Sequence, residues 1–181
     1  MSEVTQVFTQ LLQNARQNAE TLGTSWFSYA DPEQESPCQY GEVSADQQVR
    51  WWPIPRNECQ DFSNLEHGLD MKLHPDLKAF YGHHFGGGLQ VKHPRGNAEL
   101  LMVWHQDDFS RLQQNIIAHI LMKRRLKQRE TVFFAVTDDD DIMLSVLNET
   151  GAVFLEHAGC EVKEQLAGSL TEFLQQLSLP E

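Results

Sequence analysis

Three β-rich segments follow one another in the second half of the chain, at residues 131–137, 142–147 and 152–156. The connections between them are short and either acidic or glycine-containing, which is typical of an antiparallel meander. Turn-forming residues at 94–97 separate two further strand-like segments, 89–92 and 99–104, and predict a β-hairpin. The chain is therefore expected to build its core on a mostly antiparallel sheet.

Helical segments accompany these strands. Apolar residues recur at helical spacing from residue 4 to residue 22, with Ser2 placed to cap this helix and Gly23 to end it. Shorter helices are expected at residues 62–71, at residues 75–82 and from the capping box Ser169-Leu170-Thr171-Glu172 onward.

A second long helix is expected to begin at Asp107 or Asp108 and to end in the basic cluster 123–129. Acidic residues at the start of a helix and basic residues at its end both suit the helix dipole. The basic cluster allows two interpretations. It is either neutralised by nearby acidic residues or free to contact anionic lipid head groups.

The remaining segments complete the expected fold. Residues 24–38 are polar or turn-forming and predict a loop, and residues 47–52 predict a short strand that Pro53 cuts off. We expect an α+β fold in a single domain that spans residues 1–181. Its mostly antiparallel sheet should have four or five strands, with the helices packed on one side.

The net charge of −12 is distributed unevenly along the chain. Residues 1–70 carry −8 and residues 131–181 carry −9, whereas residues 71–130 carry +5. An acidic surface of this kind repels nucleic acid and anionic lipid and attracts a basic partner. The charge could instead serve only to keep the protein in solution.

The sequence also predicts the compartment. No apolar stretch approaches the roughly 20 residues that cross a bilayer, and the first residues lack the features of a secretory signal. Cys38, Cys59 and Cys160 are odd in number and lack metal-site spacing, so we expect free thiols in a reducing compartment. The protein should stay inside the cell, outside the membrane itself.

Eight histidines among many carboxylates are candidate metal ligands. The densest group surrounds His74, His83 and His84, but its spacing matches no known metal motif, so no metal ion or cofactor is predicted. A metal-dependent hydrolase that uses these histidines stays open as an alternative. The glycine run 86–88 lacks the lysine and hydroxyl of a phosphate-binding loop and precedes a strand, which predicts a flexible connection.

Several carboxylates are candidate catalytic groups. Glu66, Asp107 and Asp108 could form a general acid and base, but helix capping accounts for the two aspartates. The run Asp138 to Asp141 lacks the alternating ligands and the glycine of a calcium-binding loop, so it is interpreted as a solvated turn. No catalytic residue and no small-molecule substrate are predicted.

Several segments resemble one known family. Trp51-Trp52-Pro53-Ile54-Pro55 resembles its Trp-x-Pro-x-Pro segment, and Phe62 to Glu66 resembles the next segment of that family. The longest match runs from Leu100 to His119, a strand-to-helix signature in which Ala118 takes the place of an expected glycine. Residues 166–174 resemble the closing helix. The family is that of the Syd proteins, within the SUKH superfamily.

The resemblance implies a peripheral protein on the cytoplasmic face of the bacterial inner membrane. Such a protein binds the channel protein SecY and monitors or disrupts faulty translocase complexes, without enzymatic activity. Because the cytosolic loops of SecY should be basic, an acidic concave surface would attract them. An immunity-type binder of a basic toxin is the alternative within the superfamily. The residues expected to line that surface are Glu66, Asp70, Asp107, Asp108, Asp138, Asp139, Asp140, Asp141, Trp51 and Trp52.

Overall fold

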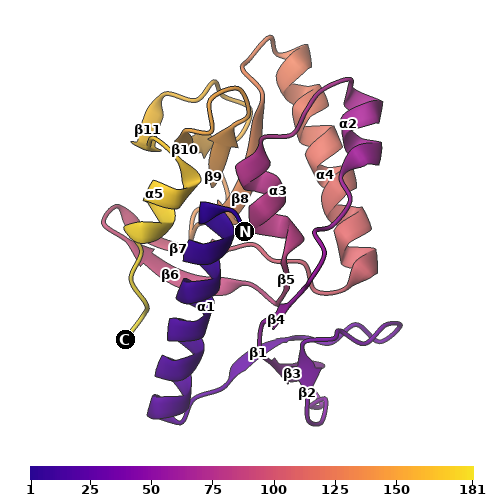
Figure 1. Ribbon diagram of the computed structural model, residues 1–181, viewed down its shortest axis with the longest axis vertical. Coiled ribbons are helices and arrows are strands. Elements are labelled where there is room, and N and C mark those ends of the chain that lie inside the picture. Colours follow the sequence, from indigo (N-terminus) through magenta and orange to yellow (C-terminus); the bar gives the residue numbers. More distant parts are fainter.

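The computed structural model describes residues 1–181 and is built around a six-stranded antiparallel sheet (Figure 1). In spatial order its strands are β11 (Glu164–Ala167), β10 (Val153–His157), β9 (Ile142–Leu147), β8 (Thr131–Val136), β7 (Gly96–Leu100) and β6 (Leu89–His93). The predicted meander and hairpin are both present, and the α+β class is confirmed. The sheet has one strand more than expected, because β11 adds to β10.

The five helices are α1 (Glu3–Leu22), α2 (Ser63–Leu69), α3 (Pro75–Gly82), α4 (Gln106–Arg125) and α5 (Leu170–Gln175). The Ser2 side chain caps α1, and Gly23 ends it in the left-handed conformation, as predicted. Ser169 accepts from the backbone N–H of Glu172 at the start of α5, which confirms the predicted cap there.

The helices cover both faces of the large sheet, so the prediction that they pack on one side was wrong. Phe133 of β8 packs on His119 of α4, whereas the next residue, Phe134, packs on Phe80 of α3 and Phe173 of α5. Figure 1 places α4 on the right and α1 and α5 on the left. The sequence pattern did not reveal this arrangement because the strands of the meander are buried on both faces, which removes a clean alternation of polar and apolar residues.

A second, smaller sheet lies at the lower end of the molecule in Figure 1. It consists of β1 (Trp26–Tyr29), β3 (Gln48–Trp51) and β2 (Gln39–Tyr40) in the spatial order β1-β3-β2. The predicted strand at 47–52 corresponds to β3, but the predicted loop at 24–38 contains β1. A further short pair, β4 (Ile54–Pro55) and β5 (His84–Phe85), joins this sheet to the large one.

The outer edges of β6 and β1, which face the region between the two sheets, differ in whether another segment pairs with them. The outer edge of β6 is partly covered, because Lys92 and Ser178 exchange both of their backbone hydrogen bonds. The outer edge of β1 has no neighbouring strand. An unpaired edge of this kind is a surface to which another chain can add.

Candidate binding groove

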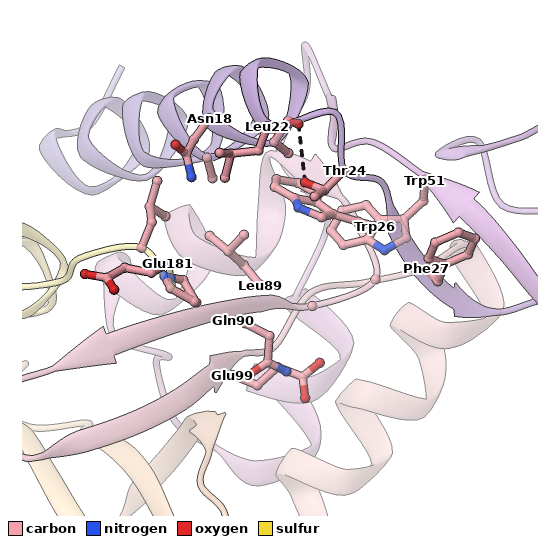
Figure 2. A pocket seen from close by; sticks show the side chains of 16 residues that line it. Asn18, Leu22, Thr24, Trp26, Phe27, Trp51, Leu89, Gln90, Glu99 and Glu181 are labelled. Atoms are coloured by element: carbon pink, nitrogen blue, oxygen red, sulfur yellow. Dashed lines mark hydrogen bonds between the residues drawn. The ribbon is translucent and has the colours of Figure 1, made fainter.

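A hollow of about 520 Å³ opens between the end of α1, strand β1 and the start of β6 (Figure 2). Trp26 and Phe27 of β1 and Leu89 and Gln90 of β6 are among the residues that line it. A second hollow, of about 440 Å³, continues from the end of β1 toward the start of α4. Both hollows share Gly87 and follow β1, so we treat them as one surface, the β1 groove.

The residues that line the β1 groove come from several segments that are distant in sequence. They are Ala15, Asn18, Ala19, Leu22, Thr24, Trp26–Asp31, Trp51, Gly86–Gln90, Glu99, Met102, Trp104, Asp108, Arg111 and Leu179–Glu181. The position of the small sheet beside the large one therefore creates this groove.

The glycine run forms the packed floor of the groove, where a flexible connection had been predicted. A Cβ atom added to Gly87 would lie 2.9 Å from Nε1 of Trp51 and 3.0 Å from Cβ of Ser28. One added to Gly86 would lie 2.5 Å from Cε of Met102. Any larger side chain would therefore push β1 or Trp51 away from the floor.

A hydrogen-bonded bridge holds the far end of the groove together. His105, which is buried, contacts the Asp31 carboxylate through Nε2 at 2.8 Å, and Ser36 donates to the carbonyl oxygen of Trp104 at 2.6 Å. Hydrogen bonds from the backbone of Glu33 and from His105 lower the pKa of Asp31. The bridge fixes the end of β1 against the start of α4.

Asp108 belongs to this end of the groove and also contacts the start of α4. Its Oδ2 accepts from the backbone N–H of Trp104 at 2.7 Å, while its own N–H donates to the ring of His105 at 3.1 Å. His105 rather than Asp107 or Asp108 is thus the N-cap residue. The helix begins where it was predicted, to within two residues, but with a different cap.

Glu99 supplies a carboxylate that no lysine, arginine or histidine of the chain neutralises. It is half-buried on β7 opposite Gln90, and its carboxylate lies against Gly88. Burial raises the pKa of Glu99, which means that the charged form is poorly solvated. A cation from outside the chain would relieve this penalty.

Two tryptophans in the groove walls have polar atoms without partners. Nε1 of Trp51 and Nε1 of Trp104 are buried, and neither has a hydrogen-bond acceptor. Trp51 is otherwise packed against Trp26 and Trp104, which confirms a core role for it. Unpaired buried donors of this kind are uncommon in folded proteins.

The predicted site residues lie in several separate places. Asp108 and Trp51 line the β1 groove, but Glu66 and Asp70 belong to another hollow along α2. Glu66 is already neutralised there, since its Oε1 accepts from Lys78 at 2.9 Å and its Oε2 accepts from the backbone N–H of Leu73 at 2.8 Å.

Four of the predicted acids occupy the turn between β8 and β9, and none of them lines the groove. These residues are Asp138, Asp139, Asp140 and Asp141. Asp107 is exposed at the start of α4 and also lies outside the groove lining. Trp52 is half-buried under the guanidinium of Arg16, 4.9 Å from the ring centre. A binding role for these residues stays a prediction.

Sequence reasoning missed Asp31, His105 and Glu99. Asp31 and His105 are 74 positions apart, and Glu99 is distinguished only by its lack of a partner in the folded chain. Composition and spacing carry no signal for either relation. The histidine of the bridge could have been suspected from its place directly before a helix.

The histidines considered as metal ligands do not form a site. No three histidine, cysteine or carboxylate side chains gather in a way that could hold a metal ion. His74 caps α3, and His84 is buried beside Thr9, with Nε2 and Oγ1 3.4 Å apart. The hydrolase alternative therefore has no ligand set in this fold.

The basic cluster 123–129 is largely neutralised by acidic residues. Lys123 is fully buried beside Glu156, and Arg124 forms an ion pair with Glu130. Arg129 pairs with Glu161, at 2.7 Å. These contacts favour neutralisation by acidic residues over contact with lipid head groups.

The fold and the groove define an acidic α+β protein with an open groove between two sheets. None of the helices combines the length and the apolar character that a membrane span requires. A family model described as Syd protein (SUKH-2) matches residues 1–179. The chain belongs to the Syd family, as the resemblance implied.

Curated relatives agree with this assignment. A protein named Protein Syd from Colwellia psychrerythraea is 38% identical and covers 98% of this chain and 96% of its own length. Its namesake from Pseudoalteromonas atlantica is 43% identical over 81% of this chain and 80% of its own length. A third, from Shewanella frigidimarina, is 46% identical over 80% of this chain and 68% of its own length.

Proposed function

We propose that this protein binds basic cytosolic loops of SecY through the β1 groove, as a peripheral protein on the cytoplasmic face of the inner membrane. It acts as a binding protein and not as an enzyme. Binding in this way would let it monitor or disrupt faulty translocase complexes. Membership of the Syd family supports a protein partner.

The observation that carries the proposal is the carboxylate of Glu99. It is half-buried and has no cationic partner within the chain. A lysine or arginine side chain that entered the groove would pair with it in a partly desolvated place, where charges interact more strongly than in water. Asp31 and Asp108 lie at the other end of the same groove, where Asp108 is 3.7 Å from Arg111 and Asp31 contacts His105, so Glu99 is the carboxylate left without a partner.

The charge of SecY fits this surface. Cytosolic loops of membrane proteins carry an excess of lysine and arginine. The net charge of −12 on this protein would increase the rate at which such loops arrive, and the groove would determine where they stay.

A pull-down experiment tests the proposal. Immobilised wild-type protein and a Glu99→Gln variant would be incubated with inverted inner-membrane vesicles, and the SecY that remains bound would be measured. Loss of one partner of a desolvated charge pair costs about 2–5 kcal/mol, so recovery by Glu99→Gln should fall at least about tenfold. Asp140→Asn is the matched control, because it removes the same charge from the exposed turn outside the groove.

Salt provides a second measurement on the same samples. Raising ionic strength from about 0.1 M to about 1 M shortens the Debye length from about 10 Å to about 3 Å, so wild-type recovery should fall steeply. Equal recovery by wild type and Glu99→Gln would show that the contact surface lies elsewhere. A loss confined to Asp140→Asn would assign the contact to the aspartate turn instead.

A further inference from the structure

Strand β1 presents backbone groups that nothing in the chain pairs. Its register with β3 places Trp26 opposite Trp51 and Ser28 opposite Val49. The next residue after the strand, Ala30, donates to the carbonyl of Gln47 at 2.8 Å. Antiparallel ladders alternate between pairs that exchange hydrogen bonds and pairs that do not. The backbone N–H and C=O groups of Trp26 and Ser28 therefore point to β3. The backbone groups of Phe27 and Tyr29 point to the open edge.

The side chains of Phe27 and Tyr29 are unusually exposed for aromatic groups. Phe27 is 57% exposed and Tyr29 is 71% exposed. Exposed edge strands in natural proteins usually carry a lysine, a proline or a bulge that prevents pairing with another chain. The sequence of β1, Trp-Phe-Ser-Tyr, has none of these. This edge is chemically suited to receive a strand.

The surroundings of the edge select a basic occupant. Residues 26–51 contain five carboxylates and a single basic residue, Arg50. Asp31 pairs with His105, and none of the other four carboxylates forms an ion pair. An acidic or neutral segment placed along β1 would gain nothing from these charges, whereas a basic segment would be attracted to them.

On the basis of the proposed function, we infer that the bound segment is extended and basic, and that it adds as a fourth strand to the open edge of β1. Its backbone pairs with the outward N–H and C=O groups of Phe27 and Tyr29. Side chains of a strand alternate between two faces, so every second residue of the segment points into the groove. A lysine or arginine at such a position lies in the same hollow as Glu99.

The edge of β6 is the other surface to which a strand could add, and it is less suitable. Ser178 already occupies the outward backbone groups of Lys92. The residues that follow, Leu179 to Glu181, line the groove next to Gln90. A strand added to β6 would have to displace this segment, whereas one added to β1 would displace nothing.

Amide hydrogen exchange on the full-length protein tests the inference directly. The probes are synthetic peptides that cover the cytosolic loops of SecY, and exchange is followed by NMR before and after peptide is added. The amides of Phe27 and Tyr29 should exchange rapidly in the free protein and slow by at least about tenfold in the complex. The amides of Ser28 and Ala30 should be protected in both states, because Ser28 already donates to β3 and Ala30 donates to Gln47, the residue before β3.

A pair of variants provides an independent measurement. Tyr29→Pro removes the outward N–H without removing a bond to β3, and Tyr29→Ala removes the same aromatic ring but keeps the N–H. Since one backbone hydrogen bond changes affinity by about 2- to 10-fold, Tyr29→Pro should bind a peptide correspondingly more weakly than Tyr29→Ala. Unchanged exchange at Ala30 in free Tyr29→Pro would show that the small sheet remains intact.

The outcomes separate this inference from the proposed function. Binding without protection of Phe27 and Tyr29, or equal affinity of the two Tyr29 variants, would overturn strand addition and leave SecY binding standing. Binding of none of the peptides by the wild-type protein, together with no recovery of SecY from vesicles, would overturn both. Protection that alternates along β1 supports the inference.

Discussion

Lys123 and Glu156 form a charged pair that is completely buried between α4 and β10, with 3.6 Å between Nζ and Oε2. Glu156 also accepts from Thr131 at 2.5 Å and lies 3.2 Å from Nε2 of His119. We predict that Lys123→Met strongly destabilises the protein. Methionine keeps most of the apolar stem but leaves the Glu156 charge without its cation.

The distance between the two charges sets the expected loss of stability. At an effective dielectric constant of about 20, two unit charges 3.6 Å apart attract by about 5 kcal/mol. Measured losses after one partner of a buried pair is removed are about 3–5 kcal/mol, and we expect a loss in that range for Lys123→Met. Adding Glu156→Gln should recover most of it, because the unpaired charge is gone and the amide still accepts from Thr131.

The pH dependence has a definite sign. Burial alone would raise the pKa of Glu156, but hydrogen bonds from His119 and Thr131 and the positive charges nearby outweigh it and lower the pKa below the usual 4.5. A lowered carboxyl pKa stabilises the fold above that usual value, and this contribution is lost as pH falls through the folded-state pKa. The Lys123→Met loss should therefore be largest near neutral pH and shrink in acid, where Glu156 becomes protonated.

Urea unfolding of the wild type, Lys123→Met and the double variant at several pH values would measure these differences. His119 also lies near Oε2 of Glu156, but it is present in all three proteins. The difference between the wild type and Lys123→Met therefore reports the loss of the lysine charge. A loss below about 1 kcal/mol at neutral pH would be typical of an exposed pair and would refute the reasoning. So would a loss that stays the same in acid.

Two further predictions concern the region around the groove. Burial lowers the pKa of His84 from 6.5 to about 4, with the charge of His83 as a smaller cause, so stability should fall as pH drops from 6.5 toward 4 and the unfolded chain takes up the proton. His84→Phe should flatten that part of the stability curve in urea titrations, and an unchanged curve would contradict the assigned pKa. Gly87→Ala should destabilise the protein by about 1–3 kcal/mol, because its Cβ would press on Trp51 and Ser28. Thermal unfolding would measure this loss, and an unaltered midpoint would mean that the groove floor yields.

The long helices were predictable because their signals are local. The apolar stripe and caps of α1 lie within its own sequence, and its observed bounds differ from the prediction by one residue at the start. Helix α4 ends at Arg125, within the predicted basic cluster 123–129, and Lys127 just beyond it adopts a positive φ of 56°. Arg129, beyond the end of the helix, pairs with Glu161, which is distant in sequence, and no helical pattern can show such a contact.

The missed strands depend on partners elsewhere in the chain. Strand β1 contains two exposed aromatic residues and lies in a polar, turn-rich segment, so it forms because β3 pairs with it. Strand β11 is short and largely polar, and it adds to the edge that β10 offers. Strand propensity depends strongly on such neighbours, which a single sequence does not display.

The acidic character of the binding surface could be predicted from the sequence, but its position on the fold could not. The excess of carboxylates indicated an acidic surface, yet the acids chosen for it were those that stood out as neighbours in sequence. Glu66 proved to be neutralised by Lys78, whereas Glu99 is left without a cation. Which carboxylates remain free is decided by tertiary contacts.

The open edge of β1 also bears on how copies of this protein keep apart in a crowded cell. Two such edges from different molecules are complementary in their backbones and could pair into a shared sheet. The carboxylates of residues 26–51 oppose this, since a second copy brings the same excess of negative charge toward its own kind. The acidity of the small sheet thus opposes pairing between two copies, while an incoming segment of opposite sign meets no such repulsion.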